Sequence, residues 1–169
     1  MLFGSKARFA IEARLNEVGV EDPFLLGRFC FWVEEEAVGD YQLGGALSVA
    51  LASCRNLLRF SGNRDDGRLI AMPAADAFTE IYSALFVDNG QSDNRVKRDS
   101  EYYTRFVAIP TGFDVFDSWM AFLIEDRTMG RYLWKKTASE ADHVHETTLQ
   151  EGEFDAVLLK FVNRFGMLR

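Results

Sequence analysis

The sequence has few of the residues that form covalent cross-links, metal sites and sharp chain breaks. Its 169 residues include two cysteines, two histidines and three prolines. Cys30 and Cys54 lie in apolar stretches and outside any CxxC spacing, so we expect two buried, unpaired thiols in a reducing compartment. A chain of this length can bury a hydrophobic core without disulfide or metal support.

Long apolar runs and an excess of basic residues are also missing. No segment approaches the length of a membrane-spanning helix, and the start MLFGSKARF lacks the apolar run of a secretory signal. The formal net charge of −7 disfavours nucleic acids and anionic membranes as partners, because both are bound through basic surfaces. We therefore expect a cytoplasmic protein with neither a nucleic-acid nor a membrane partner.

Sequence motifs of common enzymes are absent as well. The chain contains no GxSxG nucleophile elbow, no P-loop and no GxGxxG fingerprint. Acidic doublets such as Asp65-Asp66 and Glu125-Asp126 could flank a substrate, but doublets at turns are far more often solvated. We therefore expect no enzymatic activity, no catalytic residues and no cofactor.

Hydrophobic periodicity indicates the secondary structure. Alternation of apolar and polar residues predicts six strands, at residues 8–18, 27–35, 37–43, 102–109, 119–125 and 131–136. Turns are expected at 21–23 and 126–128. Helical spacing predicts three helices, at residues 43–58, 78–86 and 154–165, the second entered through Pro73 or Asp76. The polar segment 88–101 has no periodicity and is predicted to be a mobile loop.

The last predicted helix has the strongest boundary signals. Thr148 and Glu151 match the spacing of a capping box, and Gly166 lies where a C-terminal cap is expected. The order of strands, helices, strands and a final helix predicts an α+β fold with an antiparallel sheet built from hairpins. We expect a single domain that covers residues 1–169.

The segment FCFWVEEEAVGDYQLGG, residues 29–45, places bulky aromatic residues directly before three glutamates. A strand that is apolar on both faces and then leaves the core accounts for this pattern. Acidic residues recur at two later turns, with aromatic residues nearby in the sequence. Together the acidic turns are compatible with a surface for a basic protein, on which charge steers association and an aromatic anchor holds it. The predicted contact residues are Glu34, Glu35, Glu36, Asp40, Tyr41, Asp65, Asp66, Glu125 and Asp126.

The two histidines are the alternative candidate site. His143 and His145 would lie on one face of a strand, with Glu146 beside them, and such a pair can begin a metal site. A complete site would need further ligands, and the chain has no other histidine. We therefore predict no metal at this position.

The order of these motifs resembles the bacterial immunity protein family forty-two. The matching segments are FGSKARFAIEARLNE, FLLGRFCFWVEEEAVGDYQLGGAL, LIED before a turn, and LQEGEFDAVL at the last helix. The resemblance spans nearly the whole chain and is most specific at residues 27–47 and at the EGEFDAVL helix start. It implies a non-enzymatic protein, encoded beside a polymorphic toxin, that binds and neutralises a secreted or contact-delivered toxin in the cytoplasm.

We accordingly expect an inhibitor that covers the active site of its cognate toxin domain. A nuclease toxin would have a basic cleft, in which carboxylates could mimic phosphates, whereas a neutral cleft would leave the acidity as a solubility device. One alternative is a small-ligand- or metal-binding protein, or an enzyme, with its site near His143 and His145. Another is a structural subunit of a larger complex, marked by an exposed apolar patch.

Overall fold

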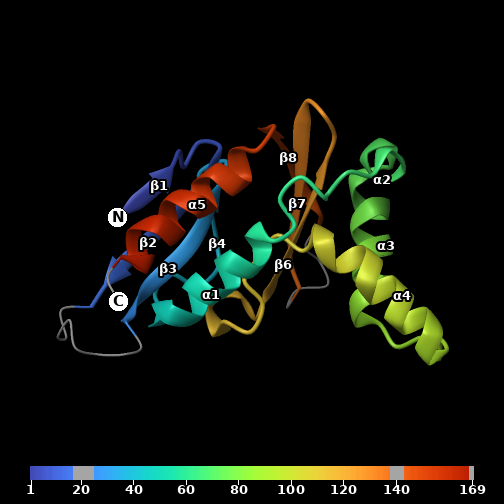
Figure 1. Ribbon diagram of the computed structural model, residues 1–169, viewed down its shortest axis with the longest axis horizontal. Helices are drawn as coiled ribbons and strands as arrows, with labels where there is room; N and C mark the ends of the chain where they lie inside the picture. The colour runs from blue at the N-terminus through green and yellow to red at the C-terminus, as the bar shows by residue number, and fades with distance from the viewer. Residues whose placement is uncertain (17–24, 138–142, 168–169) are drawn as a thin grey trace.

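Two antiparallel sheets and five α-helices make up the part of the chain that the computed structural model describes, residues 1–16, 25–137 and 143–167 (Figure 1). The predicted α+β class with antiparallel hairpins is confirmed. The strands are divided between two sheets, however, and two of the helices were not expected. No helix among the described residues is long and apolar enough to span a membrane.

The first sheet contains the N-terminal strands. Its strands are β1 (Leu2–Gly4), β2 (Phe9–Leu15), β3 (Leu26–Val33), β4 (Glu36–Val38) and the short β5 (Gly45–Ala46), which also pairs with β3. The β2–β3 register runs from Phe9↔Val33 to Leu15↔Gly27. The strands predicted at 8–18 and 27–35 are confirmed as β2 and β3 over the residues that these strands cover, whereas the return strand predicted at 37–43 is confirmed only at 37–38, within β4. Residues 17–18 and the turn predicted at 21–23 lie outside the described residues.

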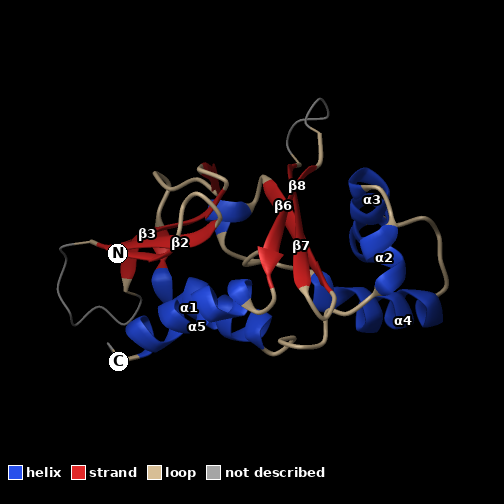
Figure 2. Ribbon diagram, turned by 90° about the horizontal axis from the view of Figure 1, so that it is seen from above, coloured by secondary structure: helices blue, strands red, loops and turns tan. Residues whose placement is uncertain are grey.

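Helices α1 (Leu47–Leu58) and α5 (Glu153–Gly166) lie side by side against this sheet (Figures 1 and 2). The layer between these helices and the sheet is rich in phenylalanine: the ring centroids of Phe29 in β3 and Phe161 in α5 are 5.1 Å apart. Cys54 is buried on the inner face of α1, and Cys30 is buried in β3, as expected for unpaired thiols. Both helices were predicted, although α1 begins four residues after Leu43.

The predicted caps of α5 are wrong. Thr148 lies in a strand, and the helix begins after Gly152, whose φ is 68°. The carboxylate of Glu153 instead accepts a hydrogen bond from the backbone N–H of Gln150. Gly166 is the last helical residue and not a left-handed cap. A glycine at the start of the helix lets the chain leave the strand abruptly, and this geometry overrode the capping-box spacing.

The second sheet lies at the centre of the molecule (Figure 2). Its strands are β6 (Trp119–Glu125), β7 (Met129–Lys136) and β8 (His145–Gln150), in that order. The β6–β7 hairpin and its turn at 126–128 are confirmed, whereas β8 was not among the six predicted strands. Tyr132 faces the first sheet, with its ring centroid 5.6 Å from that of Phe9. On the opposite face, Phe122 meets Phe78 of α3 at 4.9 Å.

The remaining helices lie on the far side of the second sheet (Figure 1). They are α2 (Gly67–Ala71), α3 (Ala74–Phe86) and α4 (Asp93–Tyr103), which continues into the 3-10 turn η1 (Thr104–Phe106). A second 3-10 turn, η2 (Asp114–Phe116), packs instead against the first sheet, where Phe116 contacts Phe29 and Phe31 of β3. Helix α3 was predicted, and Pro73 is its N-cap, in agreement with the expected entry.

The predicted loop at 88–101 and the predicted strand at 102–109 are both wrong, because most of their residues form α4 and η1. Helix α4 has no buried residue, so it lacks the apolar stripe that marks a helix in a sequence. It is supported instead by ion pairs between Arg95 and Asp99 and between Lys97 and Glu101. The Tyr103 hydroxyl also donates to Glu80 of α3 at 2.6 Å.

Candidate functional site

The β3–β4 turn carries the first predicted acidic group. Glu34 and Glu35 have φ values of 49° and 67°, the signature of a two-residue type I′ hairpin turn. Their backbone N–H groups donate to the carbonyls of Arg8 and Lys6, which fixes the turn against the β1–β2 connection. The Glu34 carboxylate accepts a hydrogen bond from the Thr147 hydroxyl at 2.6 Å. The turn is therefore held from two sides while all three glutamates remain exposed.

Asp40 and Tyr41 follow this hairpin but serve local structure. The Asp40 carboxylate accepts from the N–H groups of Gln42 and Leu43, which closes an Asx-type turn. Tyr41 is half-buried on the outer face of the first sheet, and burial together with the nearby Glu12 carboxylate raises the pKa of its hydroxyl. The same Glu12 accepts from Trp32 and pairs with Lys6, whose hydrogen bond lowers the pKa of Glu12.

A second acidic group surrounds a buried arginine. Arg64 has a fully buried side chain, and its Nη1 lies 3.2 Å from Glu125 Oε2 and 3.1 Å from Asp155 Oδ2. Its Nη2 donates to the Leu57 carbonyl at 2.8 Å. One guanidinium thus connects the loop after α1, the end of β6 and the first turn of α5. Next to it lies a hollow of about 300 Å³, lined by Ser61, Gly62, Arg64, Asp65, Glu125, Asp126, Arg127, Glu151, Gly152 and Asp155.

Negative charge dominates this hollow, which we call the Arg64 hollow. Five carboxylates line it against two guanidiniums. Burial raises the pKa of Glu125, the neighbouring Asp155 and Glu151 add to the rise, and Arg64 opposes it. Asp126 behaves differently, because hydrogen bonds from Thr128 and Met129 lower the pKa of its carboxyl. The structure therefore brings the predicted residues Asp65, Glu125 and Asp126 together.

Sequence reasoning overlooked two carboxylates of the hollow and its arginine. Glu151 was assigned only to a capping box, and Asp155 was included only as part of the predicted last helix. The available signal for Arg64 was a lone basic residue between Ser61-Gly62 and an acidic doublet, which does not distinguish a buried arginine from an exposed one. Asp66, the other half of that doublet, lies outside the hollow: it caps α2 and accepts from the Tyr102 hydroxyl at 2.6 Å.

The histidine pair lies at the start of β8. The His143 and His145 rings are 4.1 Å apart, and His145 stacks on Trp134 at 5.3 Å with an interplanar angle of 19°. Within the described part of the chain, no group of three or more His, Cys, Asp and Glu side chains could hold a metal ion. The two rings therefore extend the aromatic packing of β7.

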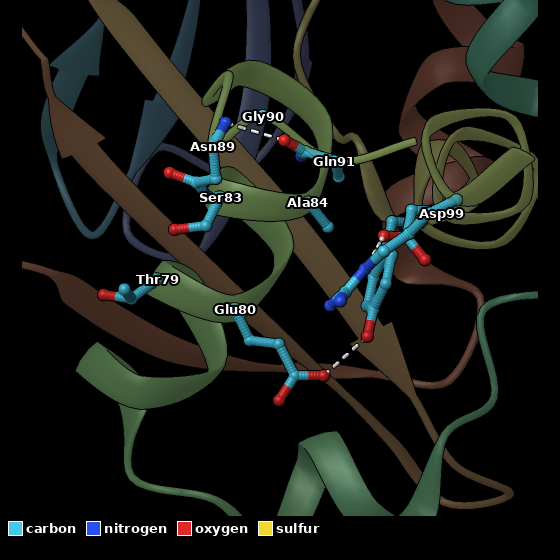
Figure 3. A pocket seen from close by; sticks show the side chains of 10 residues that line it. Thr79, Glu80, Ser83, Ala84, Asn89, Gly90, Gln91 and Asp99 are labelled. Carbon is cyan, nitrogen blue, oxygen red and sulfur yellow. Dashed lines mark hydrogen bonds and ion pairs between the residues drawn. The ribbon is translucent and has the colours of Figure 1, made fainter. Parts of the chain in front are cut away.

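A larger cleft of about 750 Å³ separates α3 from α4 (Figure 3). Figure 3 shows Glu80 of α3 and Asp99 of α4 on its two walls, with Asn89, Gly90 and Gln91 at the connection between the helices. Glu80 is already engaged, since it accepts from Tyr103 and forms a two-pronged ion pair with Arg68. The hydrogen bond from Arg68 lowers the pKa of Glu80 despite its partial burial. Sequence reasoning missed this cleft because it treated α4 as a loop.

Two comparisons with known proteins match nearly the whole chain. A family model described as immunity protein 42 matches residues 1–164. The crystal structure of CdiI from Burkholderia dolosa AUO158 superposes with a TM-score of 0.76 at 19% sequence identity, covering 97% of this chain and 99% of that one. A search of curated proteins found no match. At this identity, the structural likeness establishes a shared fold.

Proposed function

The chain belongs to the immunity protein 42 family, and from this membership we propose that it neutralises a cognate toxin in the cytoplasm by covering the toxin's active-site cleft. The observation that carries the proposal is the family match over residues 1–164. The role is one of binding, with no catalytic step, and the chain acts as a single domain. Inhibition then requires a preformed surface of roughly 800 Å² on each partner.

The acidic β3–β4 turn and the Arg64 hollow form the toxin-binding surface in this proposal. Glu35 and Glu36 are exposed, and their carboxylates have no partner among the described residues, so they are available to a second protein. The segment from β8 to α5 connects the two acidic groups. Thr147 contacts Glu34, and Glu151 of the hollow follows four residues later, a span of roughly 13 Å along an extended chain.

The proposed partner is a toxin domain with a basic cleft. The excess of carboxylates in the Arg64 hollow is complementary in charge to lysine or arginine side chains of the toxin. The raised pKa of Glu125 marks a position where a further cation would be favourable. In a nuclease these basic groups would normally hold substrate phosphates. Long-range attraction between such surfaces accelerates association and weakens with salt.

The experiment compares charge reversals at two separate places. The double variant Glu35→Lys/Glu36→Lys changes the turn without removing a hydrogen bond that the turn needs. Glu34 and Asp40 are left in place because Thr147 and the Asp40 turn depend on their carboxylates. The control, Asp76→Lys/Asp93→Lys, makes the same change of net charge at two exposed carboxylates of α3 and α4.

The measurement is stopped-flow association with the toxin domain encoded beside this chain, at 50 and 300 mM salt. We expect the turn variant to associate at least tenfold more slowly at low salt and with a flatter salt dependence, and the control to stay within about twofold. An unchanged association rate for the turn variant would eliminate the acidic turn as a contact. Failure of the wild-type protein to bind or inhibit this toxin domain would refute the proposed function itself.

A further inference from the structure

The edge of the second sheet at β8 is open. Among the described residues, β8 pairs with β7 alone. The opposite edge is covered, because β6 forms bridges from Phe122 to Val107 and from Glu125 to Asp65. The two edges of one sheet therefore differ in how much backbone they leave unpaired.

The hydrogen-bond alternation shows which groups face outward. The N–H of Asp126 donates to the Met129 carbonyl, and the N–H of Thr137 donates to the Ser118 carbonyl. In an antiparallel pair the bonded positions alternate, so the odd-numbered residues of β7 bond to β6. Its even-numbered residues consequently bond to β8, through Gly130↔Leu149, Tyr132↔Thr147 and Trp134↔His145.

Glu146 and Thr148 therefore direct their N–H and C=O groups away from the sheet. Both residues are exposed, and no described residue forms a backbone hydrogen bond with either. Proteins usually protect such an edge with lysine, proline or a bulge. Strand β8 has no lysine or proline, and its pairing with β7 is continuous. Its one charged side chain, Glu146, is paired with Arg131, whose Nη2 lies 2.6 Å from its carboxylate.

Two segments of the fold lie next to this open edge, one on each face of the sheet. On one face of the sheet, Thr147 holds the acidic β3–β4 turn through Glu34. On the other face, Arg131 donates to the carbonyls of Ile70 and Met72 in the α2–α3 connection. A strand added beside β8 would thus have carboxylates near one of its faces and the entrance of α3 near the other.

We propose that β8 receives an extended, basic segment of the toxin, which pairs with it as a fourth strand of the second sheet. This inference rests on the proposed function and adds the mode of contact. Main-chain bonds to Glu146 and Thr148 hold the segment, and lysine or arginine side chains on alternate positions reach the acidic turn. A second copy of this chain is disfavoured as the occupant. An antiparallel pair of β8 strands would bring two acidic turns toward each other, and like charges across strands are destabilising.

The first test is amide hydrogen exchange, resolved by residue, in the free protein and in its complex with the toxin domain encoded beside it. We expect exchange at Glu146 and Thr148 to slow at least 100-fold in the complex. Thr147 and Leu149 are the matched internal controls, since they bond to β7 in both states and should change little. If the complex forms and the two outward amides exchange as fast as in the free protein, the edge proposal is wrong and the proposed function stands.

The second test removes one outward N–H. Thr148→Pro deletes that donor at an edge position where β7 loses no bond, and Thr148→Ala truncates the side chain but keeps the donor. By calorimetry, we expect the dissociation constant for the toxin domain to rise at least tenfold for Thr148→Pro and less than threefold for Thr148→Ala. Equal affinities would overturn the proposal. Thermal unfolding verifies that each variant is folded, and the exchange measurement decides the matter if the proline variant is not.

Sedimentation of the free protein tests the competing occupant. We expect no self-association that depends on β8. A dimer that Thr148→Pro abolishes and Thr148→Ala preserves would assign the open edge to a second copy of the chain and overturn the proposal.

Discussion

Replacing Arg64 with methionine should destabilise the protein strongly, because methionine fills the space of the arginine stem but cannot pair with carboxylates. The fully buried guanidinium bonds to Glu125, Asp155 and the Leu57 carbonyl. Removing it leaves two largely buried acidic groups without their counter-ion. Breaking one partner out of a buried ion pair costs about 3–5 kcal/mol, a large part of the roughly 5–15 kcal/mol that stabilises a typical domain.

The loss of folding stability caused by Arg64→Met should depend on pH in a defined direction. Burial raises the pKa of Glu125 above its ordinary value of 4.5, and Arg64 limits that rise. A carboxyl whose pKa is raised by folding contributes stability at low pH and loses it as the pH rises through the folded-state pKa. Without Arg64 the pKa of Glu125 rises further. The difference in stability between wild type and Arg64→Met should therefore be larger at pH 8 than at pH 5.

Urea unfolding followed by tryptophan fluorescence and far-ultraviolet circular dichroism provides the measurement, with free energies from linear extrapolation. Arg68→Met is the control, since Arg68 also pairs with a carboxylate but is largely exposed and should cost less than about 1 kcal/mol. Adding Glu125→Gln and Asp155→Asn to Arg64→Met should recover most of the loss. A cost below about 1 kcal/mol at pH 8, or one that does not change with pH, would refute this account of the hollow.

Two further predictions concern a side-chain hydrogen bond and a glycine with a positive φ. Tyr102→Phe removes a hydrogen bond to Asp66 and should cost about 1 kcal/mol at pH 6. Burial raises the pKa of Asp66, but hydrogen bonds led by that from Tyr102 outweigh it and lower the pKa below 3.8, so this stability is lost as the pH falls through the folded-state pKa. When the free energy of unfolding is measured at decreasing pH, the variant should lose less stability than the wild type. An identical pH dependence would contradict a stabilising hydrogen bond between Tyr102 and Asp66. Gly152→Ala should cost about 1 kcal/mol in thermal unfolding because φ is 68° there, although an added Cβ meets no atom within 4 Å. Gly67→Ala, equally unobstructed but without a positive φ, should be neutral, and equal effects at the two glycines would argue against backbone strain.

Elements marked by apolar residues between clear turn signals were predictable from the sequence. The β6–β7 hairpin consists of two largely apolar strands, packed on both faces, that are joined by a turn that Asp126 closes, so its position followed from the sequence. Helix α4 gave no such signal, because ion pairs and contacts with α3 stabilise it in place of an apolar stripe. The alternation at 102–109 was misleading: Phe106 is buried within η1, and only Val107 bridges to β6.

Three carboxylates of the Arg64 hollow, Asp65, Glu125 and Asp126, were singled out from the sequence, but their arrangement in space was not predictable. Asp65 and Glu125 lie 60 positions apart in the sequence, and an isolated bridge between them brings their segments together. Periodicity carries no information on such a contact. Arg64 could not be distinguished from the other basic residues, because its burial depends on where β6 and α5 meet. Asp66 is the N-cap of α2, but the sequence analysis did not predict this helix, so the structural role of Asp66 was not recognised.

In the β3–β4 turn, backbone stability and surface charge favour different residues at the positions of the two glutamates. A type I′ turn is formed most easily by asparagine and glycine, whereas a side chain such as glutamate costs roughly 1–2 kcal/mol in the left-handed region. An engineer who sought only a more heat-resistant protein would choose this turn first. If the turn does attract the toxin, replacing Glu35 would bring that gain with slower capture, and resistance to heat and speed of protection would be competing demands on this residue.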